Sequence, residues 1–178
     1  MSLSQSKSPL VILDTGIVIK AFEFDVWPQL IARYRIVIPK TVLKEAKGYP
    51  IAGQNFLNPI DLFQWIKSGE INVVSIDVLD VINFVKNFDR TYLDKMDPGE
   101  LEALAYWHVN QASAQICSGD GIVYKAIGRL GKFDSGISLE ELLSPLGLSK
   151  GLPQQFTQVF REEMTAKGTQ DFIKNFKA

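Results

Sequence analysis

The sequence predicts a three-layer α/β/α domain, with a central parallel sheet that has helices on both faces. Two observations carry this prediction. Short, continuous apolar runs recur along the chain, and segments with helical apolar spacing separate them. A run without polar alternation is typical of a strand buried on both faces, as in parallel sheets. Strands that alternate with helices are typical of βαβ units, and 178 residues suffice for one such domain.

The apolar runs give the expected strands. The first run, LVIL, is followed directly by Asp14, and the second, IVI, by Pro39. Pro, Gly and Asp are typical of positions where a strand turns into the next element. In chain order we expect strands at residues 10–13, 36–38, 71–75 and 114–117, and a fifth near residues 132–137.

Helical patterns lie between the runs. In residues 77–88, for example, apolar side chains recur every three or four positions, which marks one helix face. We expect helices at residues 15–23, 28–33, 40–47, 60–68, 77–88 and 98–110. Residues 47–59 are rich in Gly and Pro, so an irregular insertion is expected there.

The chain after residue 145 forms a separate part. A break at residues 146–153 precedes two expected amphipathic segments, about 153–166 and 169–177. One side of the first segment is formed by Phe156, Val159, Phe160 and Met164. We therefore divide the chain into a main domain, 9–145, and a helical extension, 146–178, that packs on the same domain.

Composition excludes several classes of protein. Net charge is −1, whereas domains that wrap duplex DNA are usually basic. One cysteine permits no internal disulfide, which favours a reducing compartment. No apolar run approaches the roughly 20 residues of a membrane span. Residues 1–8 are polar and lack the apolar stretch of a signal peptide, so we expect a cytoplasmic protein without a membrane partner.

Four acidic residues stand where a parallel sheet would bring them together. In open α/β sheets, sites form beyond the carboxyl ends of the strands. Asp14 ends the first expected strand and Asp120 follows the fourth, while Glu45 and Glu100 lie in helices that adjoin the second and fourth. Helical spacing turns both glutamates toward apolar faces, where a carboxylate is costly unless a cation compensates. Hard divalent cations prefer such oxygens.

Each acid also has an ordinary structural interpretation. An aspartate after a strand commonly caps the next helix, and a glutamate in a first helical turn favours the helix dipole. Taken singly, each residue fits that interpretation. The coincidence of all four at one edge of one sheet favours a metal site.

Four stretches of the chain together resemble the PIN domain family, and in particular its Gly-Glu subgroup and its toxin-type members. In order they are VILDTGIVI (11–19), IPKTVLKEA (38–46), DPGELEALA (97–105) and ICSGDGIVYKA (116–126), within roughly residues 9–140. Each motif is short, and the ordered set is more specific than any one of them.

The resemblance implies a five-stranded parallel sheet in the order 3-2-1-4-5, with residues 9–145 as the PIN-like nuclease domain. It also implies a metal-dependent endoribonuclease that uses Mg²⁺ or Mn²⁺ to hydrolyse RNA. The implied catalytic and metal-binding residues are Asp14, Glu45, Glu100 and Asp120. The implied supporting residues are Thr15, Asp97 and Ser118. Besides RNA, the implied partners are an antitoxin protein and a second copy of the chain.

The sequence departs from the family pattern at three points. Many PIN toxins have Asp where Glu100 follows Gly99. Gly121 follows Asp120, where some relatives place another acid, so a second metal would bind more weakly. The shortest toxin-type members have no counterpart of the chain after residue 145. We assign no substrate-binding residue.

Two alternatives to the nuclease have some support in the sequence. A catalytically inactive PIN-like module that binds RNA or protein stays open, and metal binding distinguishes the two. The triplet Asp14-Thr15-Gly16 also resembles the aspartic protease motif, but that chemistry needs two such carboxylates. The exact Asp-Thr-Gly triplet does not recur in the chain, Ile17 replaces the usual small residue, and the alternating pattern does not fit an all-β fold.

The other chemistry-bearing side chains favour packing. His108, the single histidine, lies on an apolar helix side, and Cys117 lies within an expected strand as a buried, inert thiol. One histidine and one cysteine make no structural zinc site. The aromatic residues Phe22, Phe24 and Trp27 are expected to pack in the core rather than stack on bases.

Overall fold

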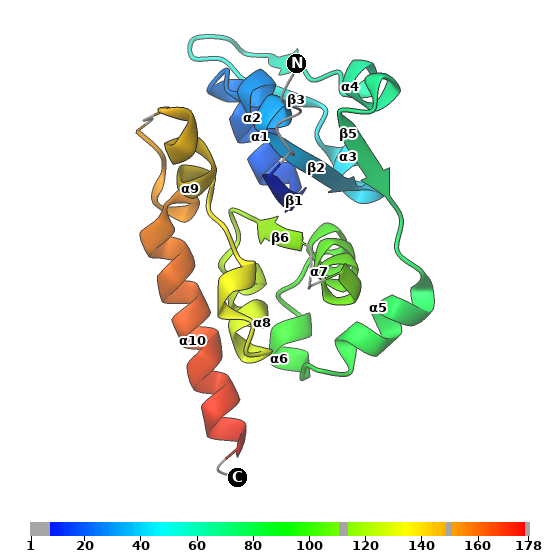
Figure 1. Ribbon diagram of the computed structural model, residues 1–178, viewed down its shortest axis with the longest axis vertical. Helices are drawn as coiled ribbons and strands as arrows, with labels where there is room; N and C mark the ends of the chain where they lie inside the picture. The colour runs from blue at the N-terminus through cyan, green and yellow to red at the C-terminus, as the bar shows by residue number, and fades with distance from the viewer. Residues whose placement is uncertain (1–7, 111–113, 149–150, 177–178) are drawn as a thin grey trace, which may run out of the picture.

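The computed structural model describes residues 8–110, 114–148 and 151–176. Within these residues the centre is a four-stranded, all-parallel sheet in the order β5-β2-β1-β6, with helices on both faces (Figure 1). The strands are Ser8–Leu13 (β1), Tyr34–Pro39 (β2), Ile71–Val74 (β5) and Ala114–Cys117 (β6). The predicted α/β architecture and its four main strands are therefore confirmed.

The helices form two layers that sandwich the sheet (Figure 1). One face is covered by α1 (Thr15–Glu23), α2 (Trp27–Arg33), α3 (Lys40–Glu45), α4 (Phe63–Ser68) and α9 (Leu139–Leu143). The other is covered by α5 (Val78–Val85), α6 (Arg90–Leu93), α7 (Pro98–Asn110) and α8 (Gly121–Arg129), with α10 (Gln158–Phe176) packed on α8.

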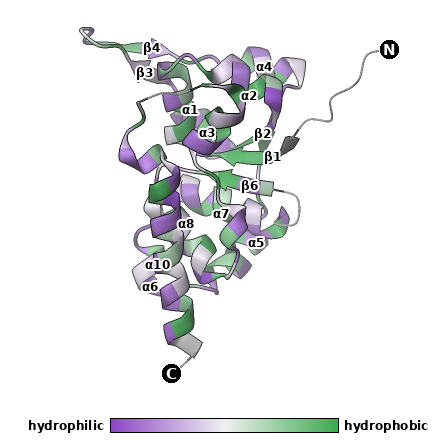
Figure 2. Cartoon of the chain, turned by 60° about the vertical axis from the view of Figure 1, so that its left-hand side comes forward, coloured by the Kyte–Doolittle hydropathy of each residue, from purple (hydrophilic) through white to green (hydrophobic). Residues whose placement is uncertain are grey.

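Residues 10–13 of β1 and 36–39 of β2 are apolar because both faces of these strands are buried there (Figure 2). In β1, Val11 and Leu13 join the core cluster beneath α1 and α2, while Ile12 joins the cluster beneath α7 and α8. A polar residue inside β1 would therefore lose its water without gaining a partner. The first polar position after this apolar run, Asp14, falls where the strand leaves the sheet.

The predicted fifth strand is wrong. Residues 132–137 contain a 3₁₀ helix, Phe133–Ser135 (η1), and only one parallel bridge, between Gly136 and Ile116, joins this segment to β6. Exposed, polar side chains such as Asp134 give a strand here no second buried face to fill. The sheet order 3-2-1-4 is observed without the fifth position.

The insertion at residues 47–59 is more regular than expected. It forms a small antiparallel pair, β3 (Gly48–Pro50) and β4 (Leu57–Pro59). Gly48 permits this close pairing, because a Cβ there would lie 2.8 Å from the carbonyl oxygen of Asn58.

The second half of the chain differs from the sequence prediction in three ways. The two expected segments form one continuous helix, α10, which follows a 3₁₀ helix, Gln154–Phe156 (η3). Val159, expected on the buried side, is 59% exposed. Helices α8 and α9 and the 3₁₀ helix Ser144–Leu146 (η2) were not predicted. Residues 1–7, 149–150 and 177, on which parts of the sequence predictions fall, lie outside the described residues.

Glycine explains why α10 continues through position 168. A Cβ at Gly168 would lie 2.0 Å from the carbonyl oxygen of Lys125, and one at Gly128 would lie 2.1 Å from that of Thr165. Two glycines therefore let α8 and α10 approach until their backbones touch, and this contact offsets the poor helix propensity of glycine. Among the described helices, none combines the length and apolar character required to cross a bilayer.

Replacing Gly168 with Ala should destabilise the protein, although alanine favours a helix interior by about 1 kcal/mol over glycine. The added methyl group would force α10 away from α8. We expect the free energy of unfolding, measured with urea, to fall by about 1–3 kcal/mol. Gly151→Ala is the control, since no described atom lies within 4 Å of a Cβ at that position. Equal losses in the two variants would contradict the close helix contact.

Candidate functional site

A cavity of about 240 Å³ opens beyond the carboxyl ends of β1 and β6. Leu13 pairs with Cys117 in the last register position of these two strands, so the loops that follow them start side by side. The polar side chains that line the cavity are Asp14, Thr15, Asp97, Glu100, Asp120 and Gln155. Three of the four predicted metal ligands, and two of the three predicted supporting residues, therefore line one cavity.

Asp14 is held by three hydrogen bonds. Its Oδ1 accepts from the backbone nitrogen of Ile17 (2.8 Å), which makes Asp14 the N-cap of α1. Its Oδ2 accepts from the backbone nitrogen of Gly119 (3.1 Å) and from the hydroxyl of Ser118. Burial raises the pKa of Asp14 above its ordinary value, while these hydrogen bonds oppose the shift and the charge of Asp120 adds to it.

Glu100 lies in the first turn of α7 and is only 8% exposed. It forms a reciprocal capping box with Asp97: the Asp97 nitrogen donates to Glu100 Oε2 (2.9 Å), and the Glu100 nitrogen donates to Asp97 Oδ1 (2.8 Å). Burial, with the negative charges of Asp120 and Asp97, raises the pKa of Glu100 to about 8. The hydrogen bond from the Asp97 backbone opposes this shift. The prediction of an inward-facing Glu100 is confirmed.

Asp120 caps α8, because its Oδ1 accepts from the Ile122 nitrogen at 2.9 Å. Its own side chain is exposed, unlike that of Glu100, and it reaches the cavity from the loop after β6. A side-chain hydrogen bond with Glu100 contributes to the raised pKa of that carboxyl. The cavity thus brings a carboxyl from α7 against one from the β6–α8 loop.

Glu45 does not look inward, and that expectation is wrong. It is exposed at the last position of α3, a helix of six residues whose C-cap is Ala46. It remains close to the cavity, since Thr15 Oγ1 donates to its Oε2 (2.8 Å) and a Cβ at Gly99 would lie 3.5 Å from the same oxygen. Glu45 therefore lies at the rim, joined to the lining through Thr15.

Ser118 supports two of the acids. It is fully buried, its hydroxyl donates to Asp14, and its Oγ accepts from the Asp120 nitrogen at 2.9 Å. The hydroxyl of Tyr124 in turn accepts from the Ser118 nitrogen (3.1 Å) and lies 2.8 Å from the Ser118 carbonyl oxygen, to which it donates. Sequence reasoning missed Tyr124, although its position one helical turn after Asp120 could have suggested a return to this loop.

Residues Gln155 and Phe156 of η3 also line the cavity and were not expected there. No motif marks them, because the resemblance ends near residue 140. Phe156, expected on the apolar side of a helix, lies in this 3₁₀ helix and is buried against Gly119, where a Cβ would lie 2.6 Å from its ring. The C-terminal part of the chain therefore forms one wall of the site.

The oxygen donors suit a hard cation, but their present arrangement does not form a complete metal site. In the described part of the chain, no group of three His, Cys, Asp or Glu side chains is placed to hold a metal ion. Several of the carboxylate oxygens are instead turned to backbone nitrogens as helix caps. No Lys, Arg or His occurs among the described residues that line the cavity, so no protein cation there balances the acids.

The remaining chemistry-bearing side chains pack as expected. The ring of His108 contacts that of Phe84 at 5.6 Å between centroids, within the cluster beneath α7. Cys117 is fully buried, and burial raises the pKa of its thiol. Phe22 stacks on the buried ring of Trp27 at 5.1 Å. These groups are placed for packing.

No protein-family model matches this sequence, and no curated protein is significantly similar to it. The PIN resemblance therefore rests on the four motifs and stays a prediction.

The metal-free protein should lose stability as the pH rises from about 5 to about 8. In this window the folded protein keeps a proton on Glu100, whose pKa is raised to about 8, while the unfolded chain releases it near its ordinary value of 4.5. Rising pH therefore favours unfolding. In EDTA we expect a loss of about 1–3 kcal/mol in the free energy of unfolding.

Glu100→Gln is the matched variant for this measurement, because an amide oxygen can still accept from the Asp97 nitrogen. It should flatten the pH dependence and be more stable than the parent protein at about pH 8. If the free energy of unfolding changed with pH equally in both proteins, Glu100 would ionise freely in the folded state.

Proposed function

We propose that this protein is a PIN-like, Mg²⁺- or Mn²⁺-dependent ribonuclease that hydrolyses phosphodiester bonds of single-stranded RNA. One observation carries the proposal. Carboxyl groups from three distant chain segments, Asp14, Glu100 and Asp120, line one cavity, where burial and neighbouring negative charge disfavour the charged forms of Asp14 and Glu100. A toxin acting with an antitoxin is the cellular role that the resemblance implies, and it belongs to this proposal.

The acids would hold the cation. Asp14 is fixed by its hydrogen bonds, whereas Glu100 and Asp120 already share a hydrogen bond that a divalent ion would replace. When bound, Mg²⁺ or Mn²⁺ supplies charge neutralisation and Lewis-acid activation for phosphodiester hydrolysis. Glu45 lies at the rim, where it orients the Thr15 hydroxyl. Removing a carboxylate should therefore cost activity more than stability.

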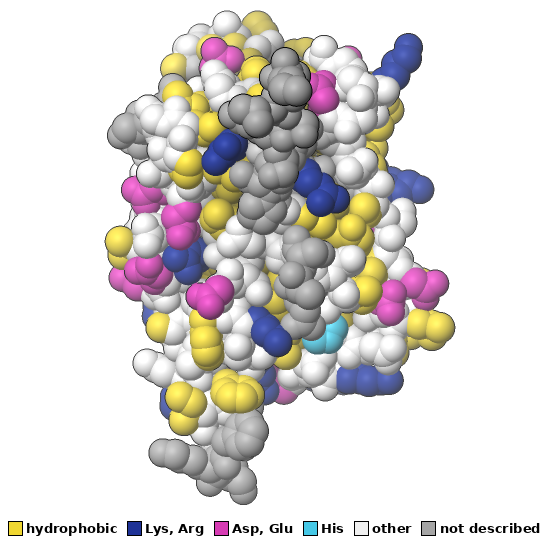
Figure 3. Space-filling model, in the orientation of Figure 1, with side chains coloured by type: hydrophobic (Ala, Val, Ile, Leu, Met, Phe, Trp, Pro, Cys, Tyr) yellow, Lys and Arg dark blue, Asp and Glu magenta, His cyan; other side chains and the backbone are white. Residues whose placement is uncertain are grey.

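The size of the cavity supports a phosphate group rather than a whole nucleotide as its occupant. At about 240 Å³ it is smaller than sites for drug-sized ligands, which typically measure about 300–1,000 Å³. An extended, flexible strand can place one phosphate there and leave its bases outside. On the face shown in Figure 3, Lys and Arg side chains among the described residues are scattered and form no single basic patch.

A non-catalytic module is the second candidate, and a specific observation favours it. Asp14 and Asp120 are helix N-caps, and Glu100 completes a capping box with Asp97. Each acid thus has a structural role that needs no metal. Such a protein would bind RNA or a protein partner without hydrolysing anything, and it would have no affinity for Mn²⁺ at this cavity.

Asp120→Asn should reduce Mn²⁺-dependent cleavage of a single-stranded RNA oligomer by at least about 100-fold. Asn caps a helix as well as Asp does, so the melting temperature in EDTA should change little. Asp14→Asn should reduce cleavage similarly, but its amide would face the Gly119 nitrogen and also cost stability.

Asp77→Asn is the matched control for cleavage. Asp77 caps α5 by accepting from the Leu79 nitrogen (2.8 Å), and it is exposed outside the cavity. The Asp77→Asn variant should cleave RNA at the same rate as the parent protein. Full activity in Asp120→Asn would refute the proposed role of the acids.

Mn²⁺ should raise the melting temperature of the parent protein. At a concentration about 100 times its dissociation constant, a ligand that binds only the folded state stabilises it by about 2.7 kcal/mol. We expect this shift in scanning calorimetry for the parent protein and Asp77→Asn, and a much smaller one for Asp120→Asn. No shift in the parent protein, with no RNA cleavage, would favour the non-catalytic module.

A further inference from the structure

The 3₁₀ helix η3 places one polar side chain, Gln155, at the cavity. This side chain makes no hydrogen bond that stabilises the described fold. Gln155 is exposed and lines the cavity, and its amide has no hydrogen-bond partner among the described residues. Its neighbours differ: Phe156 is buried in the core, and the carbonyl of Gln154 accepts from the Thr157 hydroxyl at 2.7 Å. A free amide at a cavity of carboxyl groups is available to a ligand.

Packing of the next residue, Phe156, fixes the backbone position of Gln155. The ring of Phe156 packs against Gly119, and the ammonium of Lys20 lies 5.6 Å from the centroid of the same ring. The Phe156 nitrogen donates to the Pro153 carbonyl at 3.0 Å, which closes the 3₁₀ turn. Gln155 thus lies in a turn whose next residue is anchored in the core, so the backbone that carries its amide is ordered before a ligand binds.

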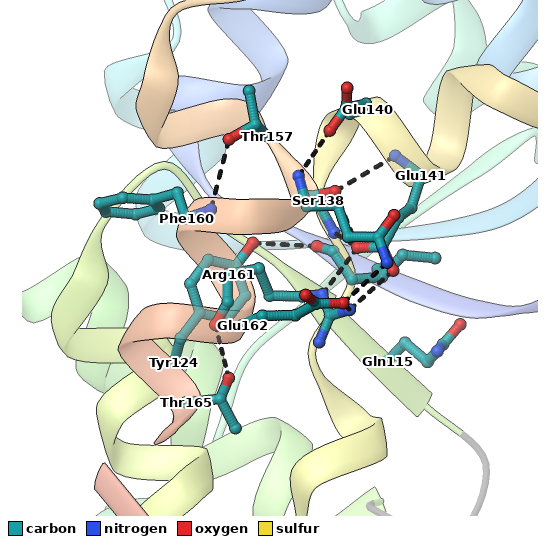
Figure 4. A network of polar contacts seen from close by, with 12 residues as sticks. Gln115, Tyr124, Ser138, Glu140, Glu141, Thr157, Phe160, Arg161, Glu162 and Thr165 are labelled. Atoms are coloured by element: carbon teal, nitrogen blue, oxygen red, sulfur yellow. Dashed lines mark hydrogen bonds and ion pairs between the residues drawn. The ribbon is translucent and has the colours of Figure 1, made fainter. Parts of the chain in front are cut away.

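Helix α10 fixes the same turn from the other end. Its first residue, Gln158, donates its backbone nitrogen to Glu140 of α9 at 2.7 Å. One turn later, Arg161 reaches Glu141 through two hydrogen bonds, from Nε at 2.7 Å and from a terminal nitrogen at 2.8 Å (Figure 4). Glu141 also accepts from Ser138 as part of the α9 capping box. This bidentate, largely buried pair holds α10 and η3 against the domain.

The electrostatics of the lining indicate what Gln155 would contact. The other polar side chains are four acids and Thr15, and the Thr15 hydroxyl donates to Glu45. A phosphodiester carries a negative charge, so the acids alone repel it. The Gln155 amide supplies two N–H donors without adding negative charge. No other side chain of the described lining offers an uncommitted donor of this kind.

We propose that Gln155 is a substrate-binding residue, whose amide donates a hydrogen bond to a phosphate oxygen of the RNA strand in the cavity. This inference rests on the proposed nuclease function and extends it to the C-terminal part of the chain, which the family resemblance does not reach. Gln155 positions the phosphate and takes no part in proton transfer. Its loss should raise KM and leave kcat and the affinity for Mn²⁺ nearly unchanged.

Gln155→Glu in the full-length chain tests the proposal, because it keeps the shape of the side chain and replaces its donor with a negative charge. With a single-stranded RNA oligomer and Mn²⁺, we expect KM to rise at least about tenfold and kcat to change less than about threefold. Gln154→Glu is the control: it makes the same charge change one residue away, outside the cavity lining, and should behave as the parent protein.

Two further readouts separate the explanations. A phosphate contact weakens binding equally for oligomers of different base sequence, so an effect confined to one base would overturn the phosphate role. A smaller Mn²⁺-induced rise in melting temperature for Gln155→Ala would mean that the Gln155 side chain binds the ion, which also overturns it. If the parent protein cleaves and both Glu variants share its KM, only this inference fails. If the parent protein neither binds Mn²⁺ nor cleaves RNA, the nuclease proposal fails and this inference with it.

Discussion

Parallel pairing of β1 with β6 is the constraint on which the site depends. The two strands end in register at Leu13 and Cys117, and the next residue of each chain segment is polar. Asp14 and Ser118 therefore meet at the sheet edge, where their side chains hydrogen bond. A shift of one residue in this register would turn the strands over and bury polar groups in the apolar core. The same packing that stabilises the sheet thus sets the distance between the first acid and the β6–α8 loop.

Helix capping and the proposed ion binding would use the same carboxyl groups. Asp14, Glu100 and Asp120 each give an oxygen to a backbone nitrogen, which keeps the helix ends satisfied without a metal. Burial and the neighbouring acids nevertheless raise the pKa of Glu100, although its capping hydrogen bond from the Asp97 backbone opposes this shift. The two functions are compatible where an aspartate or glutamate caps with one oxygen and coordinates with the other. The helix ends are therefore satisfied without an ion, and binding of the proposed ion would add stability.

The parts of the site that sequence could predict are those set by local rules. The ends of the expected strands predicted where Asp14 and Asp120 lie, and helical spacing predicted that Glu100 faces inward. Glu45 escaped the same rule because α3 stops at that residue, and the backbone of Ala46 leaves the helix at ψ 69°. The strand predicted near residues 132–137 does not form, because that segment has no second apolar face to bury. Helix geometry extrapolates well within an element and poorly at its ends.

Gln155 lay beyond sequence reasoning for a different reason. Its place depends on contacts across long stretches of chain, between Phe156 and Gly119 and between Arg161 and Glu141, and no local pattern encodes them. These contacts also make the C-terminal part structural for the site, because Phe156 packs on the glycine whose nitrogen donates to Asp14. Loosening α10 would therefore disturb the first acid as well as the wall. The extension is better understood as part of the cavity than as an addition to a finished domain.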